Sequence, residues 1–112
     1  MKLPLILAAL LAAAVCAFPA QAGAATTCKP GKYPGSGYFT SLKVTKTTCT
    51  TGRKLELAFY HCRVKHGLRG HCSGVMGYKC TEKRVSIPTE VDARVTCTRG
   101  SRRILHTYQQ NT

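Results

Sequence analysis

The sequence predicts an α+β fold in which one helix packs on a small antiparallel sheet of three to four strands, with disulfides holding the two together. Apolar and polar residues alternate over residues 91–98, as in a strand with one buried face. Apolar residues recur at helical spacing over residues 50–66. Six of the seven cysteines lie beyond residue 22 of this 112-residue chain, and so short a chain buries too little apolar surface to dispense with cross-links.

Residues 1–22 have the pattern of a secretory signal peptide. Lys2 precedes an apolar run over residues 5–18, and the small-x-small sequence of residues 20–22 is where a signal peptidase cuts. The run is too short to span a bilayer comfortably. We therefore expect a secreted, extracellular protein whose mature chain has no transmembrane segment. A lipid anchor on Cys16 is the alternative that the sequence supports less.

The mature chain is expected to begin with a loop-like segment, residues 23–37, which is rich in Pro and Gly. Residues 38–112 then form a single small domain, whose first strand alternates over residues 38–46. The helix predicted over residues 50–66 carries one apolar stripe and ends at Gly67, a natural helix stop. The residues of the stripe are Leu55, Ala58, Phe59 and Cys62.

The second half of the domain is expected to contain three strands. Residues 75–81 predict a short strand, and residues 82–90 predict a connection because they contain a proline. The alternating residues 91–98 precede an Arg-Gly pair at residues 99–100, which is typical of a tight hairpin turn. A return strand follows over residues 101–108.

The even number of cysteines in the mature chain predicts three disulfides. We expect Cys62–Cys72 to close a short loop, and Cys49–Cys80 and Cys28–Cys97 to form longer links, although six cysteines allow fifteen pairings. Each bond typically stabilises a fold by about 2–4 kcal/mol. The six residues are Cys28, Cys49, Cys62, Cys72, Cys80 and Cys97.

A zinc site is the competing interpretation of the middle segment. Thiol and imidazole groups are dense there, and both are zinc ligands. Their spacing matches no common structural zinc pattern, and two thiols outside the cell oxidise to each other. We therefore expect a disulfide and no metal. The residues concerned are His61, Cys62, His66, His71 and Cys72.

Short segments spread over the mature chain carry a resemblance to other proteins. They are residues 38–44 (YFTSLKV), Cys49 before the helix, residues 77–80 (GYKC), residues 94–101 (RVTCTRGS) and the tail at 105–112. In these segments the chain resembles uncharacterised small secreted proteins of high-GC Gram-positive bacteria. The resemblance implies export and a compact disulfide-bonded α+β domain. It implies no activity and no site residue.

Positive charge is the strongest chemical signal. The chain has 17 Lys and Arg against 4 Asp and Glu, a formal net charge of +13, and loss of Lys2 with the signal would leave +12. Two basic clusters would approach each other if strands 75–81 and 91–98 were neighbours. We expect them to bind anionic polymers, such as a cell-wall polymer, extracellular nucleic acid or an acidic lipid surface. The candidate anion-binding residues are Lys79, Lys83, Arg84, Arg94, Arg99, Arg102 and Arg103.

Aromatic residues would add stacking surfaces for single-stranded nucleic acid if they lay on the surface. Packing in the core or on a strand face is the alternative, which we favour for Phe39 and Tyr78. The aromatic residues concerned are Tyr33, Tyr38, Phe39 and Tyr78.

No catalytic constellation stands out. Glu56 is expected to be a solvated partner of Lys54 or Tyr60, and Glu90 and Asp92 are expected to share the polar face of a strand. A ribonuclease-like site would need a base, an acid and a cation beside the phosphate, yet the histidines follow no spacing typical of one. Those histidines are His61, His66, His71 and His106, with Arg102 or Arg103 as the cation.

The sequence therefore predicts a secreted, non-enzymatic basic domain that associates with anionic extracellular or cell-surface polymers and needs no cofactor. One alternative is a protein-binding or inhibitor module that presents residues 67–74, the loop closed by a Cys62–Cys72 bond. The other alternative is a small secreted nuclease.

Overall fold

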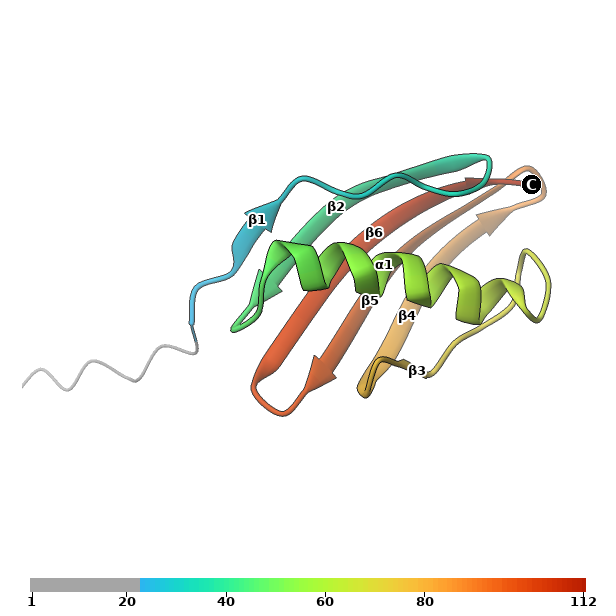
Figure 1. The fold of residues 1–112 in the computed structure, drawn as a ribbon. Coiled ribbons are helices and arrows are strands. Elements are labelled where there is room, and N and C mark those ends of the chain that lie inside the picture. The colour runs from blue at the N-terminus through green and yellow to red at the C-terminus, as the bar shows by residue number, and fades with distance from the viewer. Residues whose placement is uncertain (1–22) are drawn as a thin grey trace, which may run out of the picture.

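A computed structural model describes residues 23–112 as one six-stranded antiparallel sheet with a single helix (Figure 1). The sheet is curved into a half-barrel, and α1 crosses its concave side. The strand order is β1-β2-β6-β5-β4-β3. The predicted signal peptide and Cys16 lie outside the described residues. The elements are β1 (Thr26–Cys28), β2 (Gly37–Thr45), α1 (Cys49–Val64), β3 (Gly74–Val75), β4 (Tyr78–Ile87), β5 (Glu90–Arg99) and β6 (Arg102–Asn111).

The prediction of a sheet of three to four strands is wrong, since the sheet has six. Residues 82–90, predicted as a connection, complete a long hairpin in which β4 pairs with β5 from Lys79 to Ile87. Pro88 and Thr89 form the turn between the two strands, so the proline that argued against a strand only ends one. The loop-like segment 23–37 contributes a further short strand, β1, at the edge of the sheet.

Helix α1 confirms the predicted helix, and Leu55 and Phe59 of the predicted stripe are buried, but the buried side is shifted around the helix. The Thr48 hydroxyl caps the first turn by accepting the Thr51 amide at 3.1 Å. Ala58 and Cys62 of the predicted stripe are only partly buried. The buried residues of the helix are Gly52, Leu55, Glu56, Phe59 and Arg63.

Gly52 lies where α1 approaches β2 most closely. A Cβ atom there would lie 2.7 Å from Cγ1 of Val44 and 3.2 Å from Cδ1 of Leu42. The glycine weakens the helix as an isolated element, but it lets the helix backbone approach the sheet. Gly100 has a φ of +58° in the β5–β6 hairpin turn, as predicted, and needs the freedom of glycine for that backbone conformation alone.

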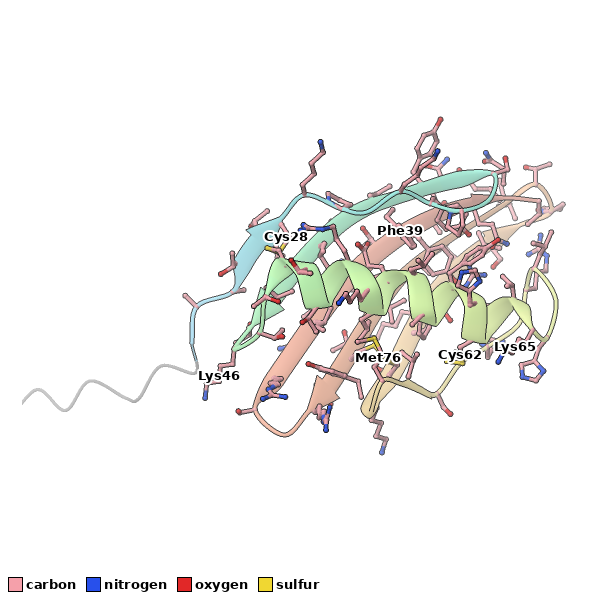
Figure 2. All side chains as sticks on the ribbon, in the orientation of Figure 1. Cys28, Phe39, Lys46, Cys62, Lys65 and Met76 are labelled. Atoms are coloured by element: carbon pink, nitrogen blue, oxygen red, sulfur yellow. A yellow bond between two sulfur atoms is a disulfide. The ribbon has the colours of Figure 1, made fainter. Side chains whose placement is uncertain are left out.

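The core fills the space between α1 and the concave side of the sheet. Phe39 lies beside α1, on the side towards β2 (Figure 2), and packs edge-on against the Tyr33 ring, with centroids 5.0 Å apart. The central strands β5 and β6 each supply four buried side chains. Fully buried apolar residues include Leu42, Val44, Leu55, Phe59, Val91, Val95 and Ile104.

Three disulfides cross-link this fold, and one of the three predicted pairings is confirmed. Cys62–Cys72 joins α1 to the segment before β3. The Cys49–Cys80 and Cys28–Cys97 pairings are wrong. Cys28 instead bonds Cys49 and holds β1 to the start of α1, near the labelled Cys28 in Figure 2. Cys80 bonds Cys97, which lies directly opposite it in the β4–β5 pair.

Candidate anion-binding face on the sheet

The convex side of the sheet, away from α1, carries a regular array of exposed side chains. Successive residues of a strand point to opposite faces, so the register of the strands fixes which side chains are neighbours. Three rows of four residues cross strands β2, β6, β5 and β4. The rows are Ser41–Thr107–Arg94–Lys83, Lys43–Leu105–Thr96–Thr81 and Thr45–Arg103–Thr98–Lys79. We call these twelve residues the outer patch.

The outer patch is basic and rich in hydroxyl groups. Five of its residues are Lys or Arg, six are Ser or Thr, one is Leu105, and none is acidic. All five cationic side chains are exposed. Lys83 and Arg94 lie directly opposite each other, although like charges in that position destabilise a sheet. The single ion pair within residues 23–112, Arg84–Glu82, involves none of the five.

The structure brings four of the seven candidate anion-binding residues together and separates the other three. Lys79, Lys83, Arg94 and Arg103 belong to the outer patch because β4 and β5 are neighbours. Sequence reasoning missed Lys43, the fifth cation. Its position between the buried Leu42 and Val44 indicates the exposed face of β2, but only the pairing of β2 with β6 places it beside the others.

The remaining three arginines lie elsewhere. Arg84 follows Lys83 in β4 and therefore points to the concave side, where its Nε donates to Glu82 at 2.9 Å. Arg99 and Arg102 are opposite each other at the end of the β5–β6 hairpin. Arg99 reaches towards the carbonyl oxygen of Met76, at 3.5 Å, so this pair forms a separate basic site at the hairpin end.

Shallow hollows mark the surface of the outer patch, and Arg94 borders three of them. One, of about 350 Å³, lies at the edge of the patch and includes Lys83, Arg94 and the acidic Asp92. The other two lie side by side within the patch. The first of these two, of about 220 Å³, is lined by three cations and two threonines, and the second, of about 310 Å³, lies over β2 and β6. Leu105 lines both. The first is lined by Thr81, Lys83, Arg94, Thr96, Arg103 and Leu105; the second includes Ser41, Lys43, Arg94, Leu105 and Thr107.

Of the four aromatic residues considered for base stacking, three are buried. Tyr33, Phe39 and Tyr78 are core residues, whereas Tyr38 is 65% exposed. Tyr38 pairs with Gln109, one row beyond the outer patch. The face therefore offers one exposed ring from this set, at its edge.

The carboxylates are divided between the core and one end of the sheet. The expectation that Glu56 is solvated is wrong: it is fully buried, and its Oε1 accepts the Gly31 amide at 3.1 Å while Oε2 has no partner. Burial raises the pKa of Glu56 to about 7. Glu90 and Asp92 lie on the same face of β5 as Arg94. Asp92 is in the row next to Arg94 and lines a hollow with Arg94 and Lys83, so it borders the outer patch, and Glu90 lies one row further away.

The histidines do not assemble a catalytic site. His106 is fully buried between the rings of Phe39 and Phe59, and burial lowers its pKa to about 3. His61, His66 and His71 are exposed near the end of α1. A buried, neutral His106 has no access to a polymer substrate, so it cannot act as the base or acid of a ribonuclease-like site.

The cysteines of the candidate zinc site, Cys62 and Cys72, are bonded to each other. Neither is therefore a thiolate available to a metal. Within residues 23–112, no group of three or more His, Cys, Asp or Glu side chains is arranged to hold a metal ion.

A second cluster of polar groups lies in the core around Arg63, which is 1% exposed. Its Nη1 donates to the Gln110 side chain at 2.8 Å and to the Leu68 carbonyl at 3.0 Å, and its Nη2 donates to the Tyr33 hydroxyl at 2.9 Å. The guanidinium also lies 4.2 Å from the centre of the Tyr108 ring. These contacts tie the end of α1 to β6 and engage Arg63 with the protein itself.

In the part of the chain that the structure describes, no helix is long and apolar enough to cross a membrane. The resemblance to small secreted bacterial proteins stays a prediction. No protein-family model, no curated protein and no solved structure matches this chain.

Proposed function

We propose that the protein is a secreted, non-enzymatic basic domain that binds anionic extracellular or cell-surface polymers through its outer patch. The observation that carries the proposal is the placement of Lys83 opposite Arg94, beside other cations and without a carboxylate partner. A like-charged pair in that position costs a sheet roughly 0.2–1 kcal/mol. An anionic ligand relieves this cost, because it places negative charge between the two side chains.

The spacing of the outer patch favours a polymer over a small ion. Neighbouring strands lie about 4.8 Å apart, which is less than the screening length of about 8 Å at physiological salt. Cations on neighbouring strands therefore reinforce each other, and the hydroxyl groups between them supply neutral hydrogen-bond donors. A chain with many negative groups gains most from such a surface, because each contact releases bound counterions.

Secretion is supported by two independent observations. Three disulfides cross-link residues 23–112, and such bonds persist in oxidising compartments. Residues 1–22 carry the pattern of an export signal.

The two alternatives have weaker support. The loop over residues 67–74 is closed by the Cys62–Cys72 bond, but its Arg69 is held by the carbonyls of Ile87 and Pro88, each at 3.0 Å. That side chain is not free to enter a partner. A nuclease would need a base, an acid and a cation beside the phosphate. His106 is enclosed by aromatic rings, and the exposed His61, His66 and His71 lie near the end of α1, on the other side of the sheet from the outer patch.

The test is retention of the protein on immobilised polyphosphate and heparin in a salt gradient. One variant removes four outer cations (Lys43→Gln, Lys83→Gln, Arg94→Gln, Arg103→Gln). Its matched control removes four exposed lysines outside the patch (Lys29→Gln, Lys32→Gln, Lys54→Gln, Lys65→Gln). Both variants lose the same net charge, and Figure 2 shows Lys65 projecting from the far end of α1.

We expect the unmodified protein and the control to elute well above about 0.1 M salt, since several phosphate contacts impose a steep salt dependence. The outer variant should elute much earlier. Elution of the unmodified protein below about 0.1 M salt, or equal retention of the two variants, would overturn the proposal.

A further inference from the structure

Resting on the proposed function, we infer that the outer patch binds a single-chain phosphodiester polymer with short, uncharged, base-free linkers. Consecutive phosphates occupy the two side-by-side hollows within the patch, which share Arg94.

The first hollow fits one tetrahedral oxyanion. Lys83, Arg94 and Arg103 surround it, and the Thr81 and Thr96 side chains lie between them. An arginine fork donates two parallel hydrogen bonds to a phosphate, and a lysine adds a point charge. The threonine hydroxyls supply further donors. A planar carboxylate presents its two oxygens in one plane and so engages fewer of these groups.

The second hollow lies on the other side of Leu105 and shares Arg94 with the first. Lys43 supplies its other cation, with the Ser41 and Thr107 side chains beside it. The Thr107 and Ser41 oxygens are 2.6 Å apart, within hydrogen-bond distance. Because the two hollows are one to two strand spacings apart, about 5–10 Å, neighbouring phosphates of one chain reach both. The linker between them then crosses the partly exposed Leu105.

The shape of the face selects among polyanions. The outer patch lies on the convex side of the curved sheet (Figure 1), so a rigid duplex or a flat lipid surface touches it only along a narrow strip. A flexible single chain follows the curvature. Non-specific binding of single-stranded nucleic acid relies on aromatic platforms for successive bases, and Tyr38 is the one exposed ring of the four considered. These features favour a base-free phosphodiester.

The experiment is a competition assay at about 0.15 M salt, in which unlabelled ligands displace a fluorescent glycerol phosphate oligomer. The competitors are glycerol phosphate with one phosphate, a synthetic dimer with two, and a longer oligomer. Three variants remove one cation each: Arg94→Gln between the hollows, Lys43→Gln in the second and Arg103→Gln in the first. Arg102→Gln, an exposed arginine of the same hairpin outside the outer patch, is the matched control.

For the unmodified protein and the control, the dimer should bind at least about tenfold more tightly than the monomer, because its second phosphate binds intramolecularly. Lys43→Gln and Arg103→Gln should each reduce that ratio by about fivefold. Arg94→Gln should reduce it more than either, since Arg94 borders both hollows. Unchanged unfolding curves establish that the variants are folded.

The results separate the two-hollow inference from the proposed function. A dimer no tighter than the monomer, or equal effects of Arg94→Gln and Arg102→Gln, would overturn the two-hollow inference while salt-sensitive polyanion binding still stood. Tighter binding of polyglutamate, single-stranded DNA, duplex DNA or anionic vesicles than of the oligomer at equal charge would also overturn it. No binding of any polyanion would overturn the proposed function itself.

Discussion

Lys83 on β4 lies directly opposite Arg94 on β5, and no carboxylate of residues 23–112 forms an ion pair with either side chain. Neighbouring cations on the exposed face repel each other, and no ion pair within the described residues offsets this repulsion. Ligand sites commonly carry residues that break a stability rule in this way. The pair therefore links the stability of the free protein to its binding of anions.

Replacement of Lys83 by threonine should stabilise the free protein and weaken its binding of polyphosphate. The change removes the repulsion with Arg94 and places a β-branched residue in a strand, which should raise the free energy of unfolding by about 0.5 kcal/mol. Affinity for polyphosphate should fall about fivefold, the effect of one exposed cation. Chemical denaturation with intact disulfides and a binding titration measure the two effects.

The control is Lys79→Thr, the same substitution on the same face of the same strand. Lys79 faces Thr98, so its removal relieves no direct repulsion and should raise stability only by the smaller gain from a β-branched residue, which both variants share. Equal stability changes in the two variants would show that the Lys83–Arg94 pair carries no cost.

Glu56 should make the protein less stable as the pH rises. Burial raises the pKa of its carboxyl from 4.5 to about 7, so the folded state binds the proton more tightly than the unfolded state. The contribution of this bound proton to the free energy of unfolding is present in full below pH 4.5 and is lost as the pH rises through about 7. Glu56→Gln keeps an oxygen for the Gly31 amide and should be the more stable protein at pH 8 by about 1–3 kcal/mol.

Unfolding free energies measured from pH 4 to 8 for both proteins isolate this effect, because His106 is common to both. The two curves should meet near pH 4 and separate above pH 5. Parallel curves over the whole range would contradict the burial of an ionisable Glu56.

Arg63 should not tolerate replacement by lysine. Lysine keeps the charge, but one ammonium group cannot reach the Tyr33 hydroxyl, the Gln110 side chain and the Leu68 carbonyl together. We expect Arg63→Lys to lower the free energy of unfolding by about 3 kcal/mol. Arg53→Lys on the same helix loses one long contact, at 3.3 Å to the Lys29 carbonyl, and should cost less than about 0.5 kcal/mol. Similar losses in thermal or chemical unfolding would refute a special role for Arg63.

Removal of the Cys62–Cys72 bond should affect stability and leave polyanion binding intact. The double replacement by alanine reopens a loop with a sequence separation of 10, which costs about 3 kcal/mol in the chain-entropy model. Neither cysteine belongs to the outer patch. If the variant stays folded but loses polyphosphate affinity, residues 67–74 take part in binding, contrary to our assignment.

The sequence predicted the elements in which the apolar residues are the ones buried in the fold. Strand β5 buries Val91, Ala93, Val95 and Cys97 on alternate positions, so its signal is clear. The second half of β4 was missed because its concave side carries Glu82, Arg84 and Ser86 in place of apolar residues. Glu82 and Arg84 bond each other there, and Glu82 also accepts the Tyr108 hydroxyl. Only the tertiary structure supplies these partners.

The candidate site depends on which strands are neighbours in the sheet, and the sequence pattern does not show the strand order. The predicted strand 75–81 is divided between β3 and β4, and only its residues 79–81 pair with β5. That pairing still brings the basic residues of β4 and β5 together. Lys43 joins them only because β2 pairs with the last strand of the chain. Lys83 and Arg84 were both predicted to bind anions, but consecutive residues of a strand point to opposite faces. Two disulfide pairings were predicted wrongly for the same reason, because the distance between two cysteines depends on which strands are neighbours.

The most direct test of the central claim is an NMR titration of the isotope-labelled protein, with its three disulfides intact, against polyphosphate. The amide shifts that change should map to β2, β6, β5 and β4 around Lys43, Leu105, Arg94 and Lys83, and they should return to their starting values as salt is added. Changes concentrated on α1 or residues 67–74, with the outer patch unaffected, would contradict the account.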